Sequence, residues 1–116
     1  FGATYINFTD SDNTLFPDYL FEMTKAIKEN GVDFGICKII HFGPLFKNVA
    51  PLIPWVLEGY PELYKIDTIQ VLAKVPCLYD IGWEQVYGHC SDGITYERLG
   101  KKYKWFHVDK ILGIHW

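Results

Sequence analysis

The feature that most constrains the fold is an apolar segment that leads directly into an acidic loop and then into an amphipathic helix. Residues 4–9 are rich in aromatic and branched side chains, which predicts a buried strand. The loop that follows reads Asp10-Ser11-Asp12-Asn13. Because ligands in open α/β sheets bind at the carboxyl ends of strands, this order predicts an α/β fold with a functional acidic loop.

The next elements follow from turn residues and from hydrophobic spacing. Pro17 and Asp18 mark the start of a helix that Asn30-Gly31 ends, with apolar residues at helical spacing between them. Residues 33–41 predict a second strand packed beside the first. The four prolines within residues 42–61 predict a loop, with one short helix around 54–58.

The second half of the chain predicts two more strand regions and one helix. Residues 66–75 have strand-like composition and are followed by a turn at Pro76. A helix is predicted from Ser91-Asp92 through Leu99, with Gly100 as its C-terminal stop. The tail, residues 104–116, predicts one or two last strands. The expected fold class is therefore α/β, a mixed sheet of about four to six strands flanked by two main helices.

Composition narrows the functional classes. A chain of 116 residues predicts a single domain, residues 1–116. The net charge is −3 and the Lys and Arg residues are scattered, which argues against a nucleic-acid partner. Three cysteines without regular spacing predict a reduced, cytoplasmic setting. No apolar run is long enough to predict a membrane span.

Asp10 and Asp12 are the first candidate site residues. Two carboxylates spaced as Asp-x-Asp on one loop can face the same divalent cation, a hard ion that prefers oxygen ligands. Such a cation bridges two phosphates and neutralises the charge of a departing diphosphate. The alternative is an ordinary turn in which the two acids accept hydrogen bonds from backbone N–H groups.

The surroundings of this pair resemble a known family. A strand, an Asp-x-Asp loop, Pro17 and an amphipathic helix follow one another within residues 2–20, an order that is similar to family 2 glycosyltransferases of the GT-A fold. The resemblance implies that Asp12 holds Mn²⁺ or Mg²⁺ on the sugar diphosphate, and that Asp10 contacts the ribose or the shell of the metal. Asn13 stands where many relatives carry another Asp, which leaves the number of ligands open.

Asp92 is the candidate catalytic base. Ser91-Asp92 occupies the place where the family usually has an acidic pair at a helix start, and the resemblance implies that the Asp deprotonates the acceptor hydroxyl. A carboxylate at a helix N-terminus tends to stay ionised, which keeps it able to accept a proton. The same features describe an ordinary N-cap, and Ser in place of the family's Glu leaves the role of Ser91 open.

His115 is the remaining candidate metal ligand. Many family members place a His near the end of the fold, where it completes the metal site, and by resemblance this role falls to His115. Without that context, a lone His is more often a hydrogen-bonded packing residue. The other histidines, His41, His89 and His107, are interpreted as structural.

Two further residues resemble the acceptor side of the family. Asp67-Thr68 and Ile81-Gly82-Trp83 are similar to the acceptor-side segment of these enzymes, a strand followed by a loop of Gly-Gly-aromatic type, and Trp83 and Glu84 are the candidate acceptor-binding residues. A Trp ring can stack on the apolar face of an acceptor sugar. The alternative is a core Trp that plugs the edge of the sheet.

The resemblance implies an inverting, metal-dependent transfer of a sugar from a nucleotide-sugar donor to a saccharide or other hydroxyl acceptor, in polysaccharide biosynthesis in the cytoplasm or at the inner face of the membrane. The chain opens at Phe1 on a strand that already ends in the motif. We therefore expect the C-terminal part of a GT-A domain without its nucleotide-binding half, weak or inactive alone, with an open sheet edge that allows homo-oligomers.

Two alternatives stay open. The string Asp10-Ser11-Asp12-Asn13-Thr14 also matches the opening motif of haloacid dehalogenase-type phosphatases, in which Asp10 would be the nucleophile and Asp12 the general acid. Those enzymes need a later acidic cluster that the sequence lacks. The other alternative is a fragment that binds sugar or metal without catalysing a reaction.

Overall fold

The structure, a computed structural model, describes residues 4–9, 13–42, 54–63, 65–82 and 91–116. The strands in these residues are β1 (Tyr5–Ile6), β2 (Asn13–Leu15), β3 (Phe34–Phe42), β4 (Pro54–Leu57), β5 (Val71–Lys74) and β6 (Trp105–His115). The helices are α1 (Tyr19–Asn30), α2 (Val75–Ile81), α3 (Ser91–Lys102) and the 3₁₀ turn η1 (Thr68–Gln70).

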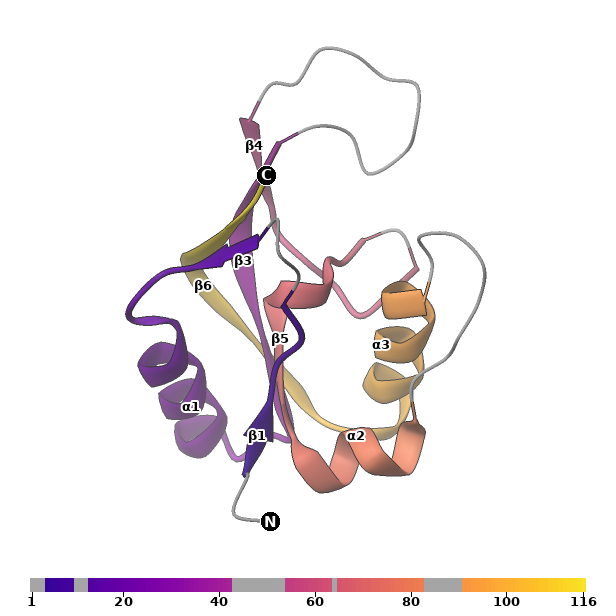
Figure 1. The fold of residues 1–116 in the computed structure, drawn as a ribbon. Helices are drawn as coiled ribbons and strands as arrows, with labels where there is room; N and C mark the ends of the chain where they lie inside the picture. The colour runs from indigo at the N-terminus through magenta and orange to yellow at the C-terminus, as the bar shows by residue number, and fades with distance from the viewer. Residues whose placement is uncertain (1–3, 10–12, 43–53, 64, 83–90) are drawn as a thin grey trace.

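One mixed sheet organises these elements (Figure 1). Its strand order is β1-β5-β3-β6-β2, and β4 also pairs with β3. The two long strands β3 and β6 run parallel, whereas the other pairings are antiparallel. The expected α/β class with a mixed sheet is therefore confirmed.

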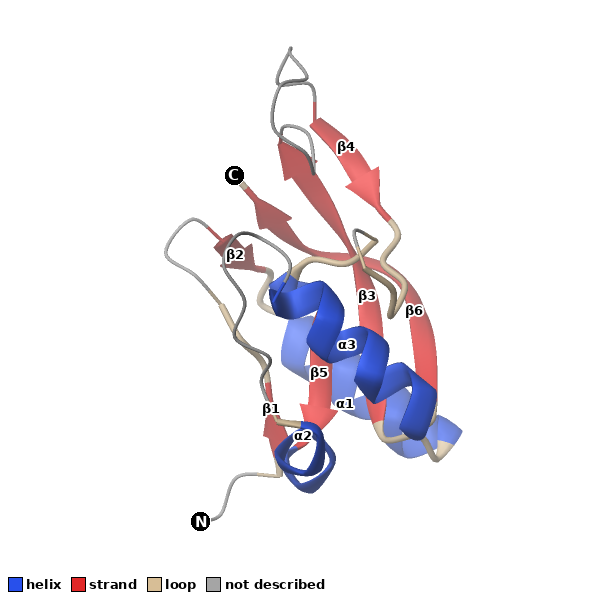
Figure 2. Ribbon diagram, turned by 90° about the vertical axis from the view of Figure 1, so that its right-hand side faces the viewer, coloured by secondary structure: helices blue, strands red, loops and turns tan. Residues whose placement is uncertain are grey.

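Helices cover both faces of the sheet (Figure 2). Helix α1 lies behind the sheet in this view, while α2 and α3 lie in front of it. Side chains in β3 alternate between two cores: Cys37 and Ile39 pack with α1, whereas Phe34 and Ile36 pack with α2 and α3. This division follows from the two-residue period of a strand, which sends successive side chains to opposite faces.

Three elements match the sequence expectation closely. Helix α1 ends at Asn30, and Gly31 after it adopts a left-handed conformation (φ 61°) and donates its backbone N–H to Ile27 O. Strand β3 covers the predicted segment, and β6 forms one strand from the tail. Because glycine has no side chain, it adopts this left-handed conformation without a steric clash, which is why Asn30-Gly31 was a reliable stop signal.

Several predictions were wrong. Residues Pro54–Leu57 form a strand rather than a helix, because they pair antiparallel with Ile39–Phe42. Residues Val75–Ile81 form helix α2 rather than a turn, since Pro76 lies in the first turn, where its missing N–H costs no hydrogen bond. The predicted strand 66–75 is split by η1 and contributes only β5 to the sheet.

Two element ends also differ from expectation. Helix α3 continues to Lys102, so Gly100 is not its stop. A Cβ at Gly100 would lie 2.7 Å from Pro61 Cβ, so this glycine serves close packing. Strand β1 ends at Ile6 instead of continuing to Thr9, and the Asn7 side chain instead donates to the carbonyl oxygens of neighbouring chain segments.

Substitution of Gly59 would test how closely the segment after β4 packs against the sheet. Gly59 and Gly31 both have positive φ, but only a Cβ at Gly59 meets other atoms, Gln70 Nε2 at 2.2 Å and Ile36 Cγ2 at 2.9 Å. Backbone strain should cost each alanine variant about 1–2 kcal/mol. Overpacking should cost Gly59→Ala a further ~1–3 kcal/mol, measured as the free energy of unfolding in urea. Equal losses in Gly59→Ala and Gly31→Ala would contradict this packing.

Candidate metal centre

A row of side chains crosses one end of the sheet. Strand pairing sets Trp55 of β4 opposite His41 of β3, His41 beside His115 of β6, and His115 opposite Asn13 of β2. Residues paired in register project to the same face of a sheet, so these four side chains lie on one face at one level. The row joins segments that lie far apart in the sequence.

Asp67 completes a cluster with the two histidines in this row. Its Oδ2 atom lies 2.9 Å from His115 Nδ1 and 3.8 Å from His41 Nε2. The two imidazole rings stack almost parallel, with centroids 4.5 Å apart and planes 5° apart. Within the described residues, this is a group whose ligand atoms all lie within 4.8 Å of one another.

Asp67 is held in place by the turn that it caps. Its Oδ1 atom accepts a hydrogen bond from the Ile69 N–H at 3.3 Å, and its own N–H donates to Gln70 Oε1 at 2.7 Å. The buried Gln70 amide also donates to Cys37 O and Leu57 O, which ties η1 to β3 and β4. The carboxylate therefore has one oxygen occupied by the backbone and the other facing the histidines.

A second set of hydrogen bonds fixes η1 from the side of α1. Tyr19 donates its hydroxyl to Ile69 O at 3.2 Å and accepts from Asn7 Nδ2 at 2.8 Å. Burial raises the pKa of Tyr19 well above its usual value, so the hydroxyl stays protonated and keeps donating. Asn7 also donates to Val71 O. These contacts connect the chain just before the Asp-x-Asp loop to the turn that carries Asp67.

Two imidazole nitrogens and a carboxylate oxygen are a suitable donor set for a divalent metal. Imidazole binds Zn²⁺, Co²⁺, Ni²⁺ and Fe²⁺ well, and carboxylates bind these ions as well as Mn²⁺ and Mg²⁺. The cysteine thiols among the described residues do not extend this set of metal donors. Burial raises the pKa of Cys37 to about 12 and also raises that of Cys77, so both remain neutral.

The predicted site residues are only partly covered by the described residues. Asp10, Asp12, Trp83 and Glu84 lie outside them, so their predicted roles stay predictions. Asp92 lies in the first turn of α3, while its side chain lies outside the description. His115 is described, and Asn13, the residue after Asp12, pairs with it directly.

Sequence reasoning missed two members of the cluster. His41 was interpreted as structural, and Asp67 was assigned to an acceptor-side segment. The structure brings both to His115 through the β3–β6 pairing and through η1. A partial signal existed, because His41 lies at the end of the predicted strand 33–41 and His115 lies near the end of the predicted strand region 104–116. Their adjacency depends on a parallel pairing that one sequence does not reveal.

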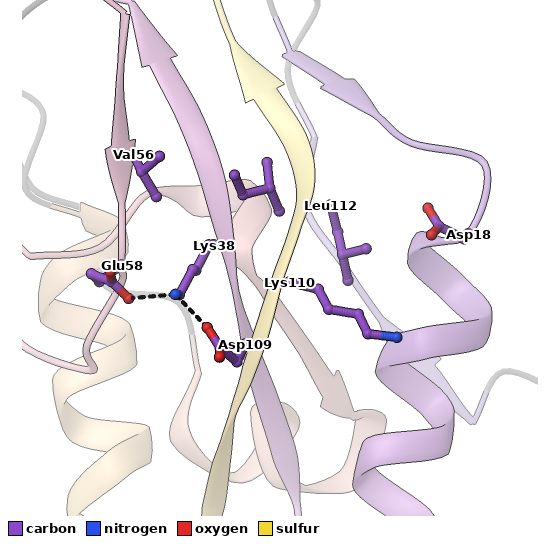
Figure 3. A pocket seen from close by; sticks show the side chains of 8 residues that line it. Asp18, Lys38, Val56, Glu58, Asp109, Lys110 and Leu112 are labelled. Atoms are coloured by element: carbon purple, nitrogen blue, oxygen red, sulfur yellow. Dashed lines mark ion pairs between the residues drawn. The ribbon is translucent and has the colours of Figure 1, made fainter.

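A depression elsewhere on the molecule does not include the cluster residues. An open cavity of about 590 Å³ lies around the middle of β6 and is bounded by Lys38, Glu58, Asp109 and Lys110 among others. Figure 3 shows Lys38 between Glu58 and Asp109, and its ammonium group forms an ion pair with each carboxylate. The Asp109 carboxylate raises the pKa of Lys38, and Lys110 pairs with Glu22 at 2.7 Å. We interpret this charge network as a feature of the surface rather than as an anion site.

Comparisons with known proteins add no assignment. No protein-family model matches the chain, and no curated protein matches it significantly. Over the described ranges, every helix is too short or too polar to cross a membrane. Functional inference therefore depends on the cluster and on the Asp-x-Asp motif of the sequence.

Proposed function

We propose that the chain is the metal-binding catalytic part of a nucleotide-sugar glycosyltransferase, with a GT-A type arrangement of its sheet and helices. In this proposal the metal, Mn²⁺ or Mg²⁺, binds beside His115 at the end of β6. The donor is a nucleotide sugar, and the acceptor is a saccharide or another hydroxyl compound. The transfer inverts the anomeric carbon, as the family resemblance implies.

The observation that carries this proposal is the pairing of Asn13 with His115. The proposal needs an imidazole from the end of the chain near carboxylates that lie about 100 positions earlier. Opposed residues of an antiparallel pair have Cβ atoms about 5 Å apart. Since Asn13 directly follows Asp12, the pairing supports a shared site for His115 and the Asp-x-Asp loop.

Aromatic side chains around this end of the sheet are compatible with a sugar ligand. Trp55 packs on His41 with ring centroids 5.4 Å apart, and Trp116 stacks on Phe42 at 5.1 Å. Trp55 and Trp116 are both exposed, 38% and 59% respectively. Exposed rings beside a polar cluster are the usual lining of a saccharide groove, because a pyranose presents an apolar face.

The proposed roles in the reaction divide between binding and proton transfer. A divalent cation, when bound, would neutralise the charge that develops on the leaving diphosphate. Asp12 and His115 would hold it, with Asp10 at the ribose or in the outer shell. Asp92 would accept the proton of the acceptor hydroxyl, and its place in the first turn of α3 favours the ionised carboxylate. Trp83 and Glu84 would contact the acceptor.

The first prediction from this proposal concerns metal-dependent nucleotide binding. UDP should bind the chain only when Mn²⁺ is present, as measured by isothermal titration calorimetry. Asp12→Ala and His115→Ala should each weaken this binding by about 10- to 100-fold, because each removes one ligand. Asp18→Asn is the matched control, since Asp18 is exposed and its side chain caps nothing, and it should bind as the unmodified chain does.

Other outcomes of this experiment separate the alternatives. UDP binding that is independent of Mn²⁺, or unchanged in Asp12→Ala, would contradict the proposal. Hydrolysis of a simple phosphoester that is lost in Asp10→Asn would favour the phosphatase instead. Sugar or metal binding without any nucleotide binding would favour the alternative of a fragment that catalyses no reaction.

The second prediction concerns Asp92. In a preparation that catalyses the transfer, Asp92→Asn should bind donor and Mn²⁺ with unchanged affinity but turn over about 10²- to 10⁴-fold more slowly, because the variant keeps the shape of the side chain but cannot accept a proton. Comparing kcat with the calorimetric Kd of the donor separates the two effects. Unchanged turnover would remove Asp92 from the role of base and leave it as a helix cap.

A further inference from the structure

We propose that His41, Asp67 and His115 form a preformed site for a late transition metal, which binds Co²⁺ or Zn²⁺ without any nucleotide. This site shares His115 with the proposed donor site. It goes beyond the proposed function because it assigns ligand roles to His41 and Asp67 and needs no substrate.

The distances in the cluster suit one shared ion. Two ligand atoms that each lie about 2.1 Å from one metal are roughly 3 to 4.2 Å apart, depending on the angle between the bonds. Asp67 Oδ2 lies 2.9 Å from His115 Nδ1 and 3.8 Å from His41 Nε2. All three donor atoms lie within 4.8 Å of one another, so small movements of the side chains would let them share an ion.

The ligands are held before any metal binds. Asp67 is fixed through its other carboxylate oxygen and through Gln70, as described above. His41 is 4% exposed and its ring lies between those of Trp55 and His115. Because their rotamers are restricted by packing, these side chains lose little conformational freedom on binding, which favours affinity.

The local charge also favours a cation. Asp67 is 7% exposed, and its ion-pair partners among the described residues are the two imidazoles, without a Lys or Arg. A buried carboxylate needs a cation or several hydrogen-bond donors to offset its loss of hydration. A divalent ion shared with neutral imidazoles would provide that compensation directly.

Asn13 supplies a second, independent observation. Its side-chain Oδ1 and Nδ2 atoms are buried and have no hydrogen-bond partner within the described segments, although the residue pairs with His115. Buried amides without partners are rare in folded proteins, and an ion with its bound water is one explanation for them. The Oδ1 atom is a fourth candidate donor, or an acceptor for a water molecule on the metal.

The donor set determines which metal the site prefers. Two nitrogen donors favour Co²⁺, Ni²⁺ and Zn²⁺ over Mg²⁺ and Ca²⁺, which prefer sites made wholly of oxygen. The side chain of His115 is 25% exposed, so an ion can reach the cluster from solvent at this end of the sheet. We therefore expect selectivity for late transition metals in the absence of nucleotide.

The experiment titrates Co²⁺ into the metal-free chain without nucleotide and records its visible absorption. We expect saturable d–d bands with one equivalent of Co²⁺, displaced by Zn²⁺ but not by millimolar Mg²⁺. His41→Gln and Asp67→Asn should each raise the Kd for Co²⁺ at least about tenfold. Asp67→Asn keeps an oxygen that can cap η1, which separates loss of a ligand from loss of the turn. His107→Gln, in the same strand as His115, is the matched control and should leave the Kd unchanged.

Each result decides the proposal. Absence of Co²⁺ bands in the unmodified chain contradicts it, and this measurement does not depend on the folding of any variant. Unchanged affinity in folded His41→Gln and Asp67→Asn, checked by circular dichroism, also overturns it. The proposed function can fail separately, because Co²⁺ binding without Mn²⁺-dependent UDP binding would retain the site and reject the transferase, whereas the reverse result would reject only the site.

Discussion

The parallel pairing of β3 with β6 is the constraint on which the rest of the structure depends. These are the longest strands described, and their register brings His41 beside His115 at one end of the sheet. A parallel pair aligns equivalent ends of two strands, so side chains at both carboxyl ends meet on one edge. The same strands divide the apolar side chains between two helix-covered cores. A shift of one residue in this register would move His115 to the opposite face of the sheet.

Buried polar contacts convert this pairing into a specific site. Gln70 bonds to β3, to β4 and to the backbone of Asp67, and Tyr19 with Asn7 holds the same turn from the other side. Each of these groups is costly to bury unless it is paired, so the network disfavours arrangements that leave any member without a partner. Asp67 is therefore delivered to the histidines by the fold of the turn. A flexible loop would not hold a carboxylate at that place as firmly.

How much of this structure the sequence could predict depends on whether a feature is set by neighbouring residues or by residues far apart in the chain. Local signals were sufficient for α1, because Asn30-Gly31 is a strong helix stop, and for β3, because it is rich in β-branched and aromatic residues. They failed at Pro76, where a proline starts a helix, and at Pro54–Leu57, where pairing with β3 overrides the prolines nearby. The proposed role of His115 as a metal ligand rests on a family resemblance. The cluster with His41 and Asp67 could not be foreseen, because it depends on pairings between segments that are distant in the sequence.

The most direct test of the account is a titration of the chain with Mn²⁺, followed by NMR of its histidine imidazoles. The paramagnetic ion broadens the NMR signals of nearby nuclei, and this broadening falls with the sixth power of the distance between the ion and the nucleus. A metal centre at this end of the sheet predicts that the His41 and His115 signals disappear first, while the His107 signal persists longer, because its partner Ile36 lies five residues before His41 in β3, roughly 17 Å away. Uniform broadening of all described histidines, or loss of His107 before His41 and His115, would contradict a metal centre at this end of the sheet.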